Sequence, residues 1–163
     1  MSVAEARTNE PELLQDRIQI VGRVQVELRD KHGRIKATRD VKNLITTVGR
    51  QWIVEQILAA PTASTKPVTM TVGTSGTAAT VADTTITTAG LTNAAKTLTS
   101  KTRSTNVLTM VANWAAGDAT GSLQEAGCFD GQGTPQLHSR ATYTTIPKGA
   151  SDTLQITWTW TIG

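Results

Sequence analysis

The sequence predicts a mainly β protein, an antiparallel β-sandwich with one short helix. Apolar and polar side chains alternate over several long segments, most clearly in residues 153–162, and such alternation gives a strand one face of each kind. Threonine, which favours strands and loops over helices, supplies 17 of the 48 residues from Thr62 to Thr109. Clusters of turn-forming residues separate these segments, and only one passage has helical spacing.

The length of 163 residues suits one domain, which can bury roughly 70% of the surface of the unfolded chain. The sandwich domain is expected to span residues 18–163. Residues 1–17 are polar, with Leu13 and Leu14 as their apolar pair, and they are predicted to form an extended N-terminal arm that is disordered or lies on a partner.

The first predicted element is a β-hairpin. Apolar residues alternate with polar ones over residues 18–28, the turn formers of DKHG follow, and residues 34–41 return with Ile35, Ala37 and Val41 on one face. Ten Lys/Arg and seven Asp/Glu lie in residues 1–50. Because acids interrupt the bases, a solvated hairpin is favoured over a nucleic-acid site.

One helix is predicted over about residues 46–59. Val48, Trp52 and Ile53 belong to an apolar stripe with steps of three and four residues. Thr46 or Thr47 can cap the start of this helix, and Pro61 can stop it. A glycine inside a helix weakens it by about 1 kcal/mol relative to alanine, so Gly49 suggests a close backbone contact.

The middle of the chain is expected to return to β structure. Val68, Met70 and Val72 alternate with threonine, and a Thr-rich loop follows over about residues 73–96. A loop of this length in a compact domain is usually functional or ordered by a partner. Because its composition is too polar to hold its own conformation, we expect contact with another chain to order it.

The remaining residues predict four strands, for a total of seven or eight. Residues 106–114 place Leu108, Met110, Ala112 and Trp114 on one face, and residues 121–131 form a short strand between glycine turns. Residues 137–146 are expected to pair with the last strand through the turn PKGASD. That last strand carries apolar residues on one face and Thr or Gln on the other, the apolar set being Leu154, Ile156, Trp158, Trp160 and Ile162.

The residues that carry chemistry do not form a recognisable active site. His32 and His138 are far apart in sequence, without a Cys or a second His at zinc-ligand spacing. Cys128 could act as a nucleophile with His138, but its apolar strand favours a buried inert thiol. Ser75 in GTSG lacks the G-x-S-x-G pattern of a nucleophile elbow. The acids of a candidate calcium loop are too few, namely Asp118, Glu125 and Asp130.

We therefore expect no enzyme, no catalytic residue, no cofactor and no metal. A single cysteine excludes a disulfide framework within the chain. No apolar run approaches the ~20 residues of a membrane span, and the first 17 residues lack the apolar core of a signal peptide. Synthesis in a reducing cytoplasm is expected, with neither membrane nor nucleic acid as a partner.

Several stretches resemble a known family. The hairpin followed by VKNLITTVGRQWIVEQILA resembles the opening of many small structural proteins of tailed bacteriophages, in which a strand pair leads to an Asn-Leu-Ile/Val segment and an amphipathic helix. MTVGTSGTAATVADT is similar to their segment with a Val-Gly-Thr-Gly start and an Ala-Ala-Thr-x-x-Asp-Thr end. LQEAGCFDG and LHSRATYTTIPKGASDTLQITWTWTIG are similar to their closing Glu-Ala-Gly-x-Phe turn, Arg-Ala-Thr strand, Lys-Gly turn and final Ile-Thr-Trp strand.

The resemblance covers residues 20–163, and residues 1–17 match nothing in it. It implies a jelly-roll-like virion protein made in a bacterial host. The first expectation is a capsid decoration (cement) protein, a homo-oligomer and specifically a trimer, that binds the major capsid protein on the outer capsid surface and stabilises the shell by bridging its subunits. The alternative is a tail, collar or fibre accessory protein. In a glycan-binding version of that alternative, exposed Trp158 and Trp160 would stack on sugars.

Overall fold

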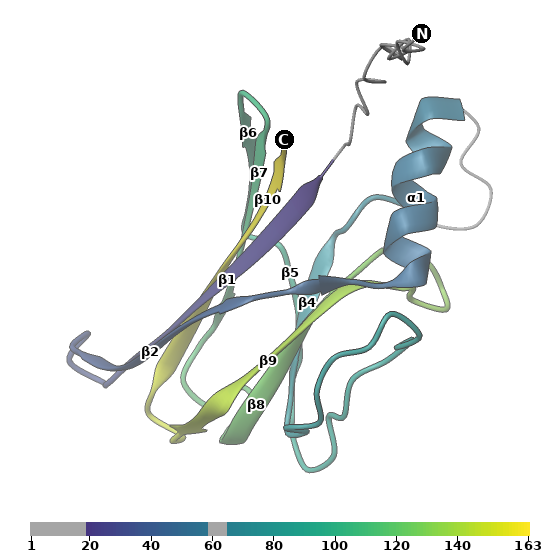
Figure 1. Ribbon diagram of the computed structural model, residues 1–163. Coiled ribbons are helices and arrows are strands. Elements are labelled where there is room, and N and C mark those ends of the chain that lie inside the picture. Colours follow the sequence, from purple (N-terminus) through teal and green to yellow (C-terminus); the bar gives the residue numbers. More distant parts are fainter. Residues whose placement is uncertain (1–18, 59–64) are drawn as a thin grey trace, which may run out of the picture.

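Two antiparallel sheets pack face to face in the computed structural model, which describes residues 19–58 and 65–163 (Figure 1). We call the sheet with strand order β2-β1-β10-β7-β6 sheet A and the sheet with order β3-β9-β8-β4-β5 sheet B. The predicted antiparallel β-sandwich with one short helix is confirmed. The predicted N-terminal arm, residues 1–17, lies outside the described residues.

The strands of sheet A are β1 Ile20–Arg29, β2 Ile35–Lys42, β6 Ser100–Ser104, β7 Val107–Trp114 and β10 Thr153–Ile162. The strands of sheet B are β3 Leu44–Ile45, β4 Thr69–Gly73, β5 Ala95–Thr97, β8 Gly121–Phe129 and β9 Leu137–Lys148. The described residues thus hold ten strands, more than the seven or eight predicted. The extra strands escape a search for periodicity because β3 and β5 are very short and β6 is exposed along its whole length.

The core lies between the two sheets. The last strand, β10, is the central strand of sheet A and borders this core. Strand β10 pairs with β1 on one side and with β7 on the other, so that Trp158 lies opposite both Val24 and Met110. Trp158 is fully buried and Trp160 is 4% exposed. The predicted inner face of this strand is confirmed, except that Ile162 at its end is 48% exposed.

Helix α1, Thr47–Leu58, covers one end of the sandwich and packs on β9 and β3 (Figure 1). Thr46 caps its start, because the Thr46 hydroxyl accepts a hydrogen bond from the Gly49 amide at 3.1 Å. The contact predicted at Gly49 is confirmed: a Cβ there would stand 2.0 Å from the carbonyl oxygen of His138. The predicted stop at Pro61 lies outside the described residues.

Two predicted details of the hairpins are wrong. Strands β9 and β10 do not pair with each other, because the turn between them crosses from sheet B to sheet A. Buried Lys148 braces this crossing by donating a hydrogen bond to the Asp152 carbonyl at 2.7 Å. In the first hairpin, Ile35 does not share the inner face with Ala37 and Val41; a register shift beside Arg29 leaves Ile35 54% exposed.

Candidate functional site

The two histidines lie at opposite ends of the sandwich. His32 is exposed in the turn between β1 and β2, whereas His138 is buried in β9 and stacks on Trp52 of α1 with 5.2 Å between ring centroids. The β1–β2 turn and α1 lie at opposite ends of the sandwich (Figure 1). Burial lowers the pKa of His138 to about 4, while the charge of Asp130 acts in the opposite direction. At neutral pH, His138 is therefore an uncharged packing partner of the helix.

Cys128 lies in the core as an inert thiol, as the sequence predicted. Its side chain is fully buried, and burial raises the pKa of the thiol, while a hydrogen bond with Ser139 acts in the opposite direction. Ser139 is also its cross-strand partner. The arrangement provides neither the thiolate nor the access that a nucleophile needs.

The other candidate functional residues form hydrogen bonds or ion pairs that stabilise the structure around them. The Ser75 hydroxyl accepts a hydrogen bond from the Thr77 amide at 3.2 Å. Asp118 pairs with Lys96 at 2.8 Å, and Asp130 accepts a hydrogen bond from the Gln136 amide at 2.9 Å. Within residues 19–58 and 65–163, no three His, Cys, Asp or Glu side chains gather where they could hold a metal ion.

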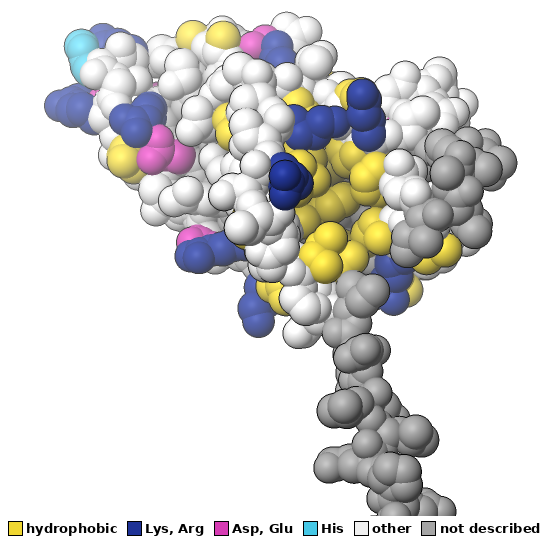
Figure 2. All heavy atoms as spheres, turned by 90° about the horizontal axis from the view of Figure 1, so that it is seen from above, with side chains coloured by type: hydrophobic (Ala, Val, Ile, Leu, Met, Phe, Trp, Pro, Cys, Tyr) yellow, Lys and Arg dark blue, Asp and Glu magenta, His cyan; other side chains and the backbone are white. Residues whose placement is uncertain are grey.

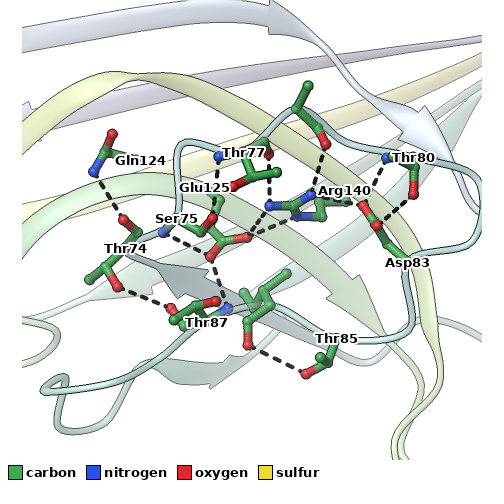
Figure 3. Close-up of polar contacts among 12 residues, drawn as sticks. Thr74, Ser75, Thr77, Thr80, Asp83, Thr85, Thr87, Gln124, Glu125 and Arg140 are labelled. Carbon is green, nitrogen blue, oxygen red and sulfur yellow. Dashed lines mark hydrogen bonds and ion pairs between the residues drawn. The ribbon is translucent and has the colours of Figure 1, made fainter.

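A polar network that the sequence did not predict lies on the outer face of sheet B (Figure 3). Glu125 of β8 is fully buried and Arg140 of β9 is 5% exposed. The Arg140 guanidinium contacts one carboxylate oxygen of Glu125 through two nitrogens, with Nε and Nη2 each 2.8 Å from Oε2. The other oxygen, Oε1, accepts hydrogen bonds from the backbone amides of Ser75 at 3.0 Å and Thr87 at 2.9 Å.

The far side of the same guanidinium extends the network into the Thr-rich loop. Arg140 Nη1 lies 2.8 Å from Asp83, and Nη2 donates to the Thr77 carbonyl at 3.0 Å (Figure 3). Asp83 in turn accepts hydrogen bonds from the amide of Thr80 at 2.9 Å and from its hydroxyl at 2.7 Å. Although burial acts to raise it, the bonds from Thr80 and Arg140 hold the pKa of Asp83 below its ordinary value.

These contacts overturn the expectation that another chain must order the loop. One buried ion pair, Glu125–Arg140, reaches three separate points of the loop at Ser75, Asp83 and Thr87. Breaking a buried ion pair of this kind costs about 3–5 kcal/mol, because the remaining charge is left without compensation. The network is a structural anchor. The Glu125 carboxylate is buried, and both of its oxygens are engaged in these contacts.

A small hydrophobic cluster completes the cover over sheet B. Ile86 of the loop packs with Phe129 and Leu137 of the sheet, and all three side chains are less than 10% exposed. The loop therefore buries both polar and apolar groups against the outer face of this sheet. Sheet B is covered on two sides, by the core and by the loop.

The outer face of sheet A has no such cover in the described part of the chain. Val21 is 45% exposed, and the Thr side chains of β10 are half-buried or exposed. The centre of this face consists of short side chains in neighbouring strands: Val107, Thr109, Val111, Thr157, Thr159 and Thr161. Toward one edge, Arg23 and Asp40 form an exposed ion pair.

The size of this face suits contact with another protein. Five strands of five to ten residues, at about 4.8 Å spacing and about 3.3 Å rise per residue, give an area of roughly 650 Å². A stable protein–protein interface buries about 800 Å² on each partner. We call this surface the outer face of sheet A, and it is the candidate functional site.

Searches against protein-family models, curated proteins and solved structures find no match to the chain. In the described residues, no helix has both the length and the apolar character needed to cross a membrane.

Proposed function

We propose that the chain is a structural protein of a tailed-phage virion, and specifically a capsid decoration (cement) protein. The open outer face of sheet A is the observation that carries this proposal, together with the resemblance of residues 20–163 to such virion proteins. The protein binds the outer capsid surface through this face and holds neighbouring subunits of the major capsid protein together. Stabilisation comes from the surface that is buried, so no catalytic group takes part.

The character of the face supports a protein partner. Short β-branched side chains such as Thr109, Val111 and Thr157 present a flat surface that loses little side-chain entropy when it is covered. The exposed Arg23–Asp40 pair at the margin is suited to selecting orientation more than to adding affinity. As a trimer, the protein would present three copies of this face and gain avidity across adjacent capsid subunits.

The number of copies per virion distinguishes a decoration protein from the alternative of a tail, collar or fibre accessory protein. A decoration protein is present in hundreds of copies per particle, whereas a neck or tail protein follows the low symmetry of that region, with about three to eighteen copies. Quantitative mass spectrometry of purified virions decides between them. The glycan-binding version does not fit the last strand, because Trp158 is fully buried and Trp160 is 4% exposed.

The binding site is tested by placing charge in the middle of the outer face. Thr109→Lys/Thr157→Lys adds two lysines to neighbouring strands on the outer face of sheet A. Thr134→Lys, on an exposed loop of sheet B, is the matched control. In sedimentation with capsids that lack the protein, the double variant should bind at least ~10-fold more weakly, a loss of about 1.4 kcal/mol or more, and the control should bind like the wild type. Wild-type binding by the double variant would refute this docking face.

A further inference from the structure

A second open surface lies at the end of the sandwich that carries α1 and the C-terminus (Figure 1). It is a groove with a volume of about 290 Å³, lined mainly by apolar side chains from the helix, the start of β1, the β6–β7 hairpin and the end of β10. The apolar residues are Ile20, Trp52, Ile53, Leu108, Trp160 and Ile162. Figure 2 looks onto this end and shows apolar side chains gathered in a hollow with Lys and Arg side chains beside it.

Several apolar side chains that line the groove are partly exposed to solvent. Ile162 is 48% exposed, and Trp52, Ile53 and Leu108 are only half-buried. Contiguous apolar surface rimmed by polar groups is typical of a site that another segment occupies. Trp52 and Trp160, with ring centroids 6.3 Å apart, form a rigid aromatic wall on one side.

Unneutralised positive charge lies beside this groove. Lys101 and Arg103 of β6 pair with the inward-facing β7 residues Met110 and Leu108, and Arg103 lines the groove. Burial and the neighbouring Lys66 lower the pKa of Lys101. Among the described residues, no carboxylate forms an ion pair with any of these three cations. Lys101 and Arg103 instead donate to the carbonyls of Pro67 at 3.1 Å and Thr105 at 2.8 Å.

The chain itself carries a segment with the complementary chemistry. Eighteen residues precede Gln19, and Gln19 forms two backbone hydrogen bonds with Gly163, of 2.8 and 2.9 Å, at the mouth of the groove. In that segment, the apolar pair Leu13–Leu14 is flanked by three acids, Glu10, Glu12 and Asp16, and by one base, Arg17, so that its flanks carry a net negative charge. The groove thus has apolar walls and a cationic rim, and the segment has an apolar centre and acidic flanks.

We propose that Leu13 and Leu14 of the same chain dock in this groove, with the flanking acids toward Lys66, Lys101 and Arg103. Reach permits this arrangement: the five residues from Leu14 to Gln19 span at most about 17 Å, and the adjoining Ile20 lines the groove. So short a tether gives an effective concentration on the order of millimolar. A second copy in solution, at micromolar concentration, competes poorly against it.

The docked segment closes the apolar end of the sandwich. It shields the half-buried indole ring of Trp52 from water and neutralises the cationic rim. The outer face of sheet A, on another side of the molecule, stays open. This inference does not depend on the proposed virion role, because it concerns the isolated chain.

Disulfide trapping in the full-length chain tests the contact. The variant Leu14→Cys/Leu108→Cys places one thiol on the segment and one in the groove. Native Cys128 does not interfere, because it is fully buried. The control Leu14→Cys/His32→Cys uses the turn at the other end of β1, about 30 Å away along the strand, which the tether cannot span.

Under mild oxidation at about 10 µM protein, the groove pair should form an intrachain disulfide on the order of a hundredfold faster than the control pair forms any disulfide. A disulfide between two chains, seen as a dimer on non-reducing gels, would overturn the proposal in favour of a second copy. Equal slow oxidation of both pairs would overturn it altogether.

A second measurement does not depend on new cysteines. Leu13→Asp/Leu14→Asp should raise acrylamide quenching of tryptophan fluorescence, because the half-buried indole of Trp52 gains access to solvent. Val3→Asp, in the same segment, should leave quenching unchanged. Quenching of the double aspartate variant that equals the wild type at every protein concentration contradicts docking.

Discussion

Sheets A and B enclose the same core, but the outer face of sheet B is covered by a loop and that of sheet A is open in the described part of the chain. The loop from Thr74 to Ala94 folds back over sheet B and buries an ion pair and a hydrophobic cluster against it. No described segment covers the flat outer face of sheet A in the same way. One sheet thus has contacts on its outer face within the chain, and the other has an open outer face, which supports the proposal that this face binds a partner.

The two sheets also differ in their buried polar side chains. Within the described residues, buried charged or polar side chains occur in β8 and β9 of sheet B, namely Glu125, His138, Ser139, Arg140 and Lys148, and in none of the strands of sheet A. Sheet A is therefore stabilised by apolar packing. Sheet B depends also on specific hydrogen bonds, which makes it sensitive to single charge changes and to pH.

The largest expected effect concerns the apolar core behind sheet A. Trp160→Ala should lower the free energy of unfolding by about 3–5 kcal/mol, a large share of the 5–15 kcal/mol of a typical domain, and should unfold the protein or abolish the proposed assembly into trimers. Thr159→Ala, on the open outer face, should stay within about 0.5 kcal/mol of the wild type. Thermal melts measure both. Comparable melting temperatures for the two variants would contradict the assignment of inner and outer faces.

The next effect concerns the cover of sheet B. Arg140→Ala leaves the buried carboxylate of Glu125 without its partner and should cost about 3–4 kcal/mol. In limited proteolysis the loop should then be cut, whereas the wild-type loop resists. The double variant Glu125→Leu/Arg140→Met removes both charges and should recover part of the stability but not the protease resistance. A loop that stays protected in Arg140→Ala would show that the ion pair does not anchor it.

A smaller expected effect is a pH dependence of the free energy of unfolding that comes from His138 in sheet B. Burial lowers the pKa of His138 to about 4 in the folded state, against about 6.5 in the unfolded chain. The unfolded state therefore takes up the proton first as pH falls. Stability present above pH ~6.5 is lost progressively down to pH ~4, by about 3 kcal/mol in total.

The matched variants are His138→Gln and His32→Gln. Denaturant unfolding at a series of pH values from ~7 to ~4 should show a weaker pH dependence for His138→Gln. His32 is exposed, so its replacement should leave the wild-type slope intact. An unchanged slope in His138→Gln would place the pH sensitivity elsewhere.

The two sheets also differ in how well the sequence predicts them. In β1, β7 and β10 one face meets the core and the other meets solvent, so alternation reveals each strand and its inner face directly. In β8 and β9 both faces are covered, and buried residues run consecutively from Glu125 to Asp130 and from Leu137 to Ala141. Such runs show that a strand exists but do not show which sheet it joins, so β9 was wrongly paired with β10.

The candidate site could be predicted only in part. The solvent-facing threonines of β10 follow from alternation, but their assembly with β1 and β7 into one face depends on the pairing of strands far apart in sequence. The sequence presents Glu125 as a candidate calcium ligand, and it presents Glu125 and Arg140 within the Glu-Ala-Gly-x-Phe and Arg-Ala-Thr motifs of the resemblance, none of which predicts an ion pair between them. An ion pair across neighbouring strands leaves no periodic signal, because its two residues lie 15 positions apart in sequence.

The most direct test of the contrast between the sheets is a cysteine footprint on bound particles. Thr159→Cys places a thiol on the outer face of sheet A, and Thr85→Cys places one on the exposed surface of the loop that covers sheet B. Both should react with a maleimide in the free protein, while buried Cys128 stays silent. On capsids, labelling of Thr159→Cys should fall at least ~10-fold and labelling of Thr85→Cys should not change. Protection of Thr85→Cys with free labelling of Thr159→Cys would contradict the claim that sheet A carries the docking face.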